Sequence, residues 1–178
     1  KMKALLKIEK ISKSFNGLHA LNDFSCYIGK GEIVGLIGPN GAGKTTLFNL
    51  LTGFLKADSG KAQFNNKDLV KLSPMQISTA GISRTFQNLR MIRQISVLDN
   101  IILALKDLQS ETVIKALFNR TELRESERLN REKAVHLLSV VGLENKASSR
   151  AESLSYGQQK LVNLMMCIAS DARLILLD

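Results

Sequence analysis

Apolar and polar residues alternate along the first third of the chain in a way that predicts β-strands. Phe24, Cys26 and Ile28 are separated by polar or amphipathic residues, so one face of an extended segment would be apolar. The apolar run at residues 33–37 instead predicts a strand buried on both faces, as in a parallel sheet. Two more short strands are expected at residues 60–64 and 82–86.

Spacings of three and four residues between apolar side chains predict helices farther along the chain. Leu47, Leu50 and Leu51 share one helical face, and Gly53 ends that segment. A second helix is expected between residues 73 and 81, because it would start at a Ser-Pro pair and stop at a glycine.

The segment from residue 88 to residue 154 is expected to be mainly helical. Ser96 followed by Asp99 has the spacing of a capping box at a helix start. The highly charged stretch 121–141 predicts a long helix that ends at Gly142. Its apolar face is expected to hold Leu129, Leu137, Leu138 and Val141.

The last predicted helix begins after Ser155, because serine favours the N-cap position. Residues 174–177 then predict a buried strand that ends in the carboxylate of Asp178. The apolar face of the last helix is expected to hold Leu161, Leu164, Met165 and Ile168.

The composition is that of an ordinary globular protein. The chain has 178 residues, 44% hydrophobic and 23% charged, which is enough for a sizeable core. No apolar run approaches the roughly 18 to 20 residues that cross a bilayer, so a soluble cytoplasmic chain is expected. Cys26 and Cys167 lie far apart in apolar surroundings, which favours buried free thiols over a disulfide or a metal pair.

The formal net charge of +9 is concentrated in the first part of the chain. Residues 1–110 carry 15 basic and 7 acidic side chains, a difference of +8, whereas residues 111–178 carry 10 and 9, a difference of +1. Runs of consecutive Lys and Arg are lacking and tyrosines are few, so no nucleic-acid partner is expected. We interpret the excess as mainly solvated surface, with anionic ligands or a membrane surface as the alternative.

The strongest chemical motif is a glycine-rich loop directly after the apolar run at residues 33–37. It fits the pattern G-x-x-x-x-G-K-[ST], in which backbone N–H groups surround phosphate oxygens. Lys44 can reach the outer phosphates, the Thr45 hydroxyl can ligate Mg²⁺, and the helix start behind them favours anions. The loop therefore predicts binding of a nucleoside triphosphate, with a glycine-rich turn of an unrelated α/β domain as the alternative. Its residues are Gly38, Pro39, Asn40, Gly41, Ala42, Gly43, Lys44, Thr45 and Thr46.

Several other residues are candidates for a nucleotide site because of their order along the chain relative to this loop. Phe15 precedes it, Gln87 follows it, and residues 154–158 read LSYGQ shortly before Asp178. Taken singly, Phe15 would be a core or hairpin aromatic, Gln87 an ordinary strand-end amide, and Ser155 a plain helix N-cap. A serine hydroxyl with the backbone N–H groups that follow it nevertheless forms an anion site, which suits a γ-phosphate.

This order of motifs resembles the ATP-binding cassette of ABC transporters over essentially the whole chain. The resemblance implies that Phe15 stacks on adenine, that Gln87 senses Mg²⁺ and the γ-phosphate and couples to the membrane partner, and that Asp178 holds Mg²⁺ through water. Residues 154–158 match the family's signature motif, whose commonest form is LSGGQ. Through that motif Ser155, Gly157 and Gln158 would contact an ATP held by a second copy.

The segments 46–54 and 81–88, together with Tyr156 in the signature, look like the LivG-type ATPase of branched-chain amino acid importers. Importers for urea or other polar solutes share these segments, so the transported solute stays open. The resemblance implies an α/β fold with a P-loop NTPase core of the ABC ATPase type, an antiparallel β subdomain and a helical insert.

Three parts of the chain are expected on this basis: a nucleotide-binding core at residues 1–87, a helical subdomain at 88–154, and the signature helix with the Walker B strand at 155–178. In the family, the catalytic glutamate, the switch histidine and a strand of the central sheet follow the position of Asp178. We therefore expect an incomplete central sheet and a longer subunit of which this chain is a part.

The function implied by the resemblance is that of an ATPase subunit at the inner face of the cell membrane. Two copies would bind ATP and Mg²⁺ head to tail and drive transmembrane permease subunits, with Lys44, Gln87 and Asp178 as catalytic residues and Thr45, Gln87 and Asp178 near the metal. Two other hypotheses stay open. One is a soluble ABC ATPase that acts on DNA or ribosomes, and the other is a nucleotide-binding fragment without turnover.

Overall fold

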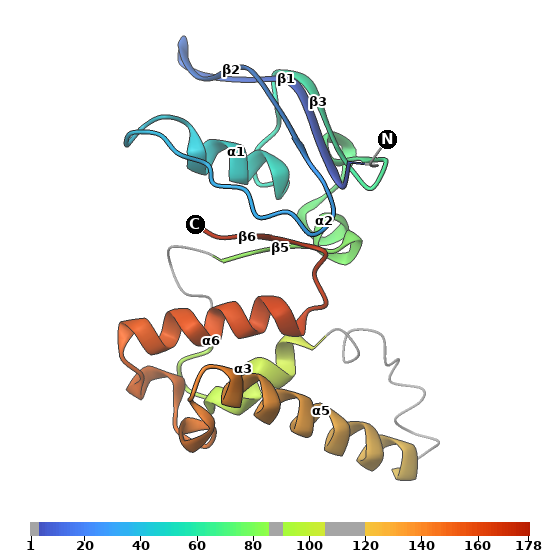
Figure 1. Cartoon of the computed structure of the whole chain (residues 1–178), viewed down its shortest axis with the longest axis vertical. Helices are drawn as coiled ribbons and strands as arrows, with labels where there is room; N and C mark the ends of the chain where they lie inside the picture. Colours follow the sequence, from blue (N-terminus) through green and yellow to red (C-terminus); the bar gives the residue numbers. More distant parts are fainter. Residues whose placement is uncertain (1–3, 86–90, 106–119) are drawn as a thin grey trace. The chain divides into compact units, whose positions relative to one another are not determined.

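The structure is a computed structural model that describes residues 4–85, 91–105 and 120–178, the first four of the last range by their backbone alone (Figure 1). Contacts divide the chain into two compact units, Lys1–Ile82 and Ser83–Asp178. The three-part division at residues 87/88 and 154/155 stays a prediction.

The first unit is built on an antiparallel sheet with the strand order β2-β1-β3-β4 among the described residues. The central strand β1 (Leu6–Phe15) pairs with β2 (Leu18–Ile28) on one side and with β3 (Ser59–Phe64) on the other. The short β4 (Lys67–Asp68) extends the sheet beyond β3. The antiparallel β subdomain that the family resemblance implies is therefore present.

One face of this sheet forms the core of the first unit. Leu6 and Ile8 of β1 are buried opposite Phe64 and Ala62 of β3. In β2 the alternation predicted for residues 24–28 is confirmed, because every second side chain is partly buried and the others are exposed. The period of two thus identified the strands and also the face that they bury.

Two helices cover the first unit, and both begin and end where the sequence signals predict. α1 (Lys44–Leu51) buries the three leucines of its predicted face. α2 (Pro74–Ala80) begins with a reciprocal capping box between Ser73 and Gln76, and Gly81 ends it with φ of +104°. A 3-10 turn, Leu69–Lys71, precedes α2.

The predicted buried strand at residues 33–37 is wrong for this structure. Within the described residues this segment belongs to no sheet, and the side chains of Ile33 and Ile37 are almost completely exposed. A strand buried on both faces needs hydrogen-bonding neighbours and covering layers. The apolar pattern records a preference for burial, but the described part of the chain does not supply those neighbours.

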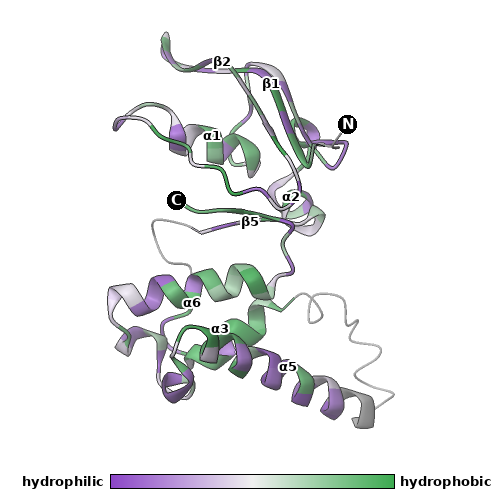
Figure 2. Ribbon diagram, viewed as in Figure 1, coloured by the Kyte–Doolittle hydropathy of each residue, from purple (hydrophilic) through white to green (hydrophobic). Residues whose placement is uncertain are grey.

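The second unit is a helical assembly with one small sheet. α3 (Val97–Ala104), α5 (Arg120–Val140) and α6 (Tyr156–Ala169) contribute to a single apolar core, and 3-10 turns at Glu144–Lys146 and Ala151–Ser153 connect α5 to α6. Figure 2 shows α3 as mainly hydrophobic, with more hydrophilic residues along α5. None of the helices within the described ranges is both long and apolar enough to cross a membrane.

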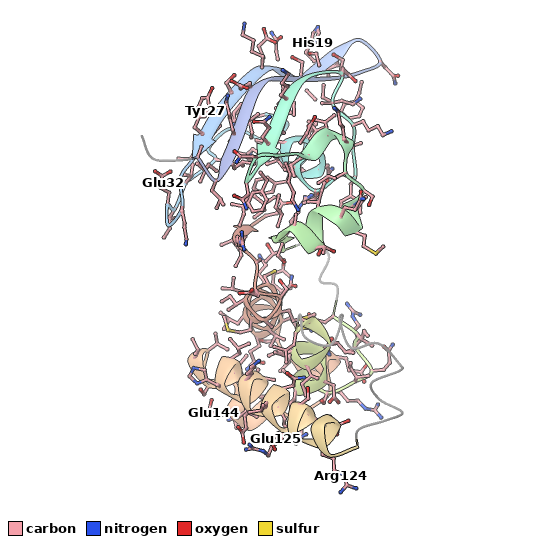
Figure 3. All side chains as sticks on the ribbon, turned by 90° about the vertical axis from the view of Figure 1, so that its right-hand side faces the viewer. His19, Tyr27, Glu32, Arg124, Glu125 and Glu144 are labelled. Atoms are coloured by element: carbon pink, nitrogen blue, oxygen red, sulfur yellow. The ribbon has the colours of Figure 1, made fainter. Side chains whose placement is uncertain are left out.

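The buried face of α5 differs from the predicted one at Leu129. Leu138 is buried as predicted, and Leu137 and Val141 pack, partly buried, against the same core. Leu129 is 44% exposed, and the buried stripe runs through Asn130, Ala134 and Leu138 at intervals of four residues. Leu129 lies one residue, or about 100°, away from that stripe. Farther toward the helix start, Arg124 and Glu125 project away from the core (Figure 3).

The buried face of α6 is also rotated from the predicted one. Met165 belongs to the core as predicted and Leu164 packs, partly buried, against it, but Leu161 and Ile168 are 40% and 45% exposed. The core positions are Val162, Met165 and Ala169, at intervals of three and four residues. The helix carries apolar residues on most of its circumference, so periodicity alone does not identify which face meets α3 and α5.

Both cysteines are free thiols, as predicted. Cys167 is buried on α6, whereas Cys26 in β2 is only partly buried. Burial raises the pKa of the Cys167 thiol, and a hydrogen bond with Ser83 acts in the opposite direction.

β5 (Ile82–Arg84) and β6 (Leu174–Leu176) form the two-stranded sheet of the described residues. The strands predicted at 82–86 and 174–177 are therefore confirmed over their first three residues. Leu176 is buried but Leu177 is 61% exposed, so the predicted burial does not extend to the end of the apolar run. The next residue, Asp178, lies just past the end of β6.

Candidate functional site

The glycine-rich loop makes a tight turn directly before α1. The N–H of Ala42 donates to the carbonyl oxygen of Pro39 at 3.2 Å. Gly41 and Gly43 have φ of +84° and +81°, which is the left-handed region that glycine adopts without a steric penalty. The loop conformation therefore depends on glycine at these two positions.

A second constraint requires glycine at position 43: its Cα lies so close to β2 that a Cβ atom has no space. A Cβ atom at this position would come within 2.2 Å of the Ala20 carbonyl oxygen and 3.0 Å of a Leu21 methyl group. No side chain fits so close to backbone. The start of α1 is thereby fixed against the sheet of the first unit.

Lys44, the first residue of α1, reaches back over the loop. Its ammonium Nζ donates to the carbonyl oxygens of Gly38 and Pro39, both at 2.7 Å. The neighbouring Thr45 is exposed and Thr46 is partly buried. The loop thus holds one positive charge in a defined place, beside a hydroxyl group that is open to solvent.

The N-terminus of α1 has the properties of an anion site. Gly43 is its N-cap, and among the described residues no side chain caps the first turn and no acidic residue lies in it. The first N–H groups of a helix have no partner inside the helix and carry partial positive charge. These groups and the Lys44 ammonium are suited to phosphate oxygens.

Phe15 lies at the end of β1, opposite Leu18 in the hairpin. Its ring is 44% exposed, and the Lys13 ammonium lies 5.6 Å from the ring centroid. Lys13 also pairs with Asp58 at 2.6 Å, and this contact, with the N–H of Ser14, holds the pKa of the Asp58 carboxyl below its usual range. Phe15 is therefore a partly open aromatic surface at the end of a strand and not a core side chain.

Asp178 is held by the residues that end β5. Its carboxylate forms an ion pair with Arg84, and both side chains are buried. Its backbone N–H donates to the Thr85 hydroxyl at 3.1 Å, while the N–H of Thr85 donates to the carbonyl of Leu176 at 3.0 Å. Two consecutive residues thus fix both the main chain and the side chain of Asp178.

The residues of the predicted signature lie together at the start of α6. Ser155 and Gln158 form a reciprocal capping box: the Gln158 N–H donates to Ser155 Oγ at 3.3 Å, and the Ser155 N–H donates to Gln158 Oε1 at 3.0 Å. Tyr156 and Gly157 are exposed, and the Lys160 ammonium lies 4.8 Å from the centroid of the Tyr156 ring. The interpretation of Ser155 as a helix N-cap is confirmed, and its hydroxyl also lies at an exposed turn.

Gly157 has no structural role that explains its identity. Its backbone is helical, and a Cβ atom here would meet nothing within 4 Å among the described atoms. Glycine in a helix is less favourable than alanine by about 1 kcal/mol. Unlike Gly43, Gly157 is therefore not required by close packing among the described atoms.

The predicted site residues thus form three groups. The loop and Phe15 belong to the first unit, and Ser155, Gly157 and Gln158 lie together in the second unit. Asp178 lies beside Arg84 and Thr85, and Gln87 lies outside the described residues. Sequence reasoning missed Arg84, although an arginine inside a predicted strand can be a buried charge that needs a partner.

The donors available for Mg²⁺ are few but of a suitable kind. Within the described ranges no group of three or more His, Cys, Asp or Glu side chains could hold a metal ion. Mg²⁺ is commonly bound by one or two protein oxygens together with substrate phosphates and water. The Asp178 carboxylate and the Thr45 hydroxyl are each oxygen donors of that kind, one in the second unit and one in the first.

Known proteins with a similar sequence show the family to which the chain belongs. A profile of the ABC transporter family matches residues 21–178. The probable branched-chain amino acid transport ATP-binding protein LivG of Archaeoglobus fulgidus is 38% identical over 174 residues, which is 98% of this chain and 66% of that protein. The high-affinity branched-chain amino acid transport ATP-binding protein BraF of Pseudomonas aeruginosa is 33% identical and covered over 68% of its length.

Solved structures agree with the sequence relatives. The crystal structure of a nucleotide-free ATP-binding cassette from an ABC transporter matches 99% of this chain with a TM-score of 0.78 and 35% identity, over 69% of its own length. The ADP conformation of such a cassette matches 97% of this chain with a TM-score of 0.76 and 34% identity, over 67% of its length. The chain therefore spans about two thirds of the relatives it matches.

Proposed function

Because the chain belongs to the ABC transporter family of ATP-binding cassettes, we propose that it is the ATP-binding portion of an importer subunit, which couples ATP binding and hydrolysis to solute transport. The observation that carries this proposal is the start of α1. Backbone N–H groups without a side-chain cap and the Lys44 ammonium converge there on one loop.

The first step is capture of the triphosphate. The N–H groups of the loop bind phosphate oxygens, and the Lys44 ammonium, now on the carbonyl oxygens of Gly38 and Pro39, moves to the outer phosphates. The exposed ring of Phe15 stacks on the adenine base. Binding therefore combines a charge-assisted phosphate site with an aromatic surface for the base.

Mg²⁺ is the proposed cofactor, and it supplies neutralisation of phosphate charge. Thr45 would offer its hydroxyl and Asp178 its carboxylate to the ion. Gln87, which lies outside the described residues, keeps its predicted role beside the γ-phosphate and toward the membrane partner.

The second half of the ATP site comes from a second copy of the subunit. The exposed Ser155 hydroxyl and the N–H of Gly157 approach the γ-phosphate bound to the other copy, with Gln158 fixing Ser155 through the capping box. Gly157 supports this role, since its lack of a side chain gives no benefit to the helix that contains it. Two cassettes thus close head to tail over two ATP molecules.

Branched-chain amino acids are the proposed solutes. The support is that LivG and BraF, which are 33% to 38% identical to this chain, are branched-chain amino acid transport proteins. On this proposal the subunit docks on permease subunits at the inner face of the membrane. The substrate contacts then lie in those other subunits, so they are to be tested in the assembled transporter.

The experiment that tests the proposal is ATP titration of the Lys44→Ala variant. Loss of a charge-assisted contact of about 2.8 kcal/mol corresponds to a roughly hundredfold weaker Kd for ATP. Lys30→Ala is the matched control, because Lys30 is an exposed lysine outside the loop and its loss changes the net charge equally. Calorimetry on both variants separates a specific phosphate contact from a general effect of charge.

Equal ATP affinity in Lys44→Ala and the unchanged chain would contradict the assignment. Turnover is measured separately, by release of inorganic phosphate. Binding without phosphate release would support the hypothesis of a nucleotide-binding fragment, whereas release that disappears in Lys44→Ala would support the ATPase.

A further inference from the structure

The ion pair between Arg84 and Asp178 is the most deeply buried ion pair among the described residues of the second unit. The Arg84 side chain is 4% exposed and the Asp178 side chain 10% exposed. The contact joins the guanidinium Nη2 to the carboxylate Oδ2. Both charged groups are largely shielded from water, so the ion pair is the main stabilisation of each charge.

Thr85 fixes the same aspartate in a different way. Its hydroxyl accepts the N–H of Asp178 at 3.1 Å, and its own N–H donates to the Leu176 carbonyl. This contact concerns the main chain alone and brings no charge. The end of β5 therefore offers two separable interactions with Asp178, one neutral and one cationic.

In the proposed function, the Asp178 carboxylate also interacts with Mg²⁺, which is a second cation beside Arg84. The following inference rests on that proposed function. A carboxylate oxygen that is engaged by a guanidinium is a weaker acceptor for a metal ion or for a metal-bound water. Two cations that approach one carboxylate also repel each other, and the repulsion is strong where water is largely excluded.

We propose that Arg84 is a positioning residue that holds the Asp178 carboxylate in place and competes with Mg²⁺ for it. Arg84 then sets the metal concentration at which the Asp178 carboxylate takes up the ion. In the absence of metal it neutralises a buried carboxylate. When metal and ATP bind, the guanidinium has to share the carboxylate or withdraw from Oδ2.

The test uses the full chain, with Mn²⁺ as a probe in place of Mg²⁺. The amount of protein-bound Mn²⁺ is measured by equilibrium dialysis with ATP on both sides of the membrane, so that Mn²⁺ bound to free ATP cancels. The Arg84→Met variant, which removes the competing charge, is expected to lower the half-saturating Mn²⁺ concentration about tenfold, which corresponds to about 1.4 kcal/mol. Arg84→Lys keeps a cation at this position and is expected to restore most of the original value.

The Thr85→Val variant is the matched control. It removes the neutral contact with the Asp178 main chain and leaves the competing cation, so Mn²⁺ binding is expected to weaken. Competition thus predicts opposite shifts for Arg84→Met and Thr85→Val, whereas a merely structural role for both residues predicts weaker binding in both. The double variant Arg84→Met with Asp178→Asn should bind Mn²⁺ no more tightly than Asp178→Asn alone.

A half-saturating concentration that stays equal or rises in Arg84→Met would overturn the inference. If Arg84→Met does not fold, Arg84→Gln, which keeps a hydrogen-bond donor without the charge, is measured in its place with the same expected direction. Absence of ATP-dependent Mn²⁺ binding in the unchanged chain would count against the proposed function itself, so the two failures are distinguishable.

Discussion

The starts of α1 and α6 carry the two motifs that we propose to bind phosphate, and they are built in opposite ways. α1 begins at Gly43 with φ of +81°, and in the described part of the chain no side chain caps its first turn. α6 begins at Ser155 in an extended conformation, with a complete capping box to Gln158. One helix start leaves its N–H groups to a ligand, and the other satisfies two of them from its own sequence.

This difference separates a primary binding site from a secondary one. The first turn of α1 lacks the stabilisation that a cap gives, which is about 1 kcal/mol for an ordinary helix. In the proposed function bound phosphate supplies the missing partners, which would couple local stability to ligand binding there. α6 is stable by itself and presents an ordered, exposed turn, which suits a surface that closes over an ATP already bound elsewhere.

Glycine to alanine substitutions at the two helix starts test this comparison most directly, and the largest effect is expected at Gly43. Gly43→Ala forces alanine into the left-handed region and against the Ala20 carbonyl at 2.2 Å. The two costs together predict a loss of about 3 kcal/mol in the free energy of unfolding. Urea unfolding followed by circular dichroism measures it.

Gly41→Ala is the control for the Gly43 experiment. Gly41 has a similar φ of +84°, but a Cβ atom there meets no described atom within 4 Å. Only the conformational cost of about 1 kcal/mol is expected. Equal losses in the two variants would show that the close approach to β2 is not what fixes Gly43.

Ser155 is expected to give the second largest effect, and two variants separate its two roles. Ser155→Ala removes the cap and should lower the free energy of unfolding by about 1 kcal/mol. Ser155→Asp keeps a capping oxygen and should preserve stability, but its negative charge should repel the γ-phosphate and prevent ATP-dependent dimerisation. Thermal unfolding measures the stability, and sedimentation in the analytical ultracentrifuge with ATP measures the dimerisation. Dimers of Ser155→Asp with undiminished affinity would refute the proposed contact.

The smallest effect is expected at Gly157, with the opposite sign to that at Gly43. Gly157→Ala places alanine at an open helical position and should raise the free energy of unfolding by about 0.5 kcal/mol. The same methyl group should weaken ATP-dependent dimerisation, because it occupies the approach to the γ-phosphate of the other copy. A variant that is more stable and dimerises as before would remove the argument that a second copy requires this glycine.

Local signals in the sequence predicted most boundaries of the fold. The ends of α2, the starts of α3 and α6, and the strands at residues 59–64 and 174–176 follow from caps, turns and alternation, which act between residues close in sequence. The phosphate loop was predictable for the same reason, since glycines, lysine and threonine at fixed spacing define its conformation and its chemistry together.

Contacts between distant residues were not predictable in this way. The buried stripe of α5 passes through Asn130 and not Leu129, because the positions of α3 and α6 decide which side of the helix is covered. Arg84 and Asp178 are 94 residues apart in sequence, and no periodicity relates them. Their pairing follows from the alignment of β5 with β6.

The sequence by itself determined the phosphate loop, the helix caps and the family to which they belong, because each depends on residue types at short, fixed separations. The tertiary structure decided which apolar faces are buried, that residues 33–37 stay outside any described sheet, and that Arg84 rather than solvent faces the carboxylate of Asp178. These features depend on neighbours brought together by folding, and hydrogen bonding and burial are properties of pairs of segments and not of one segment alone.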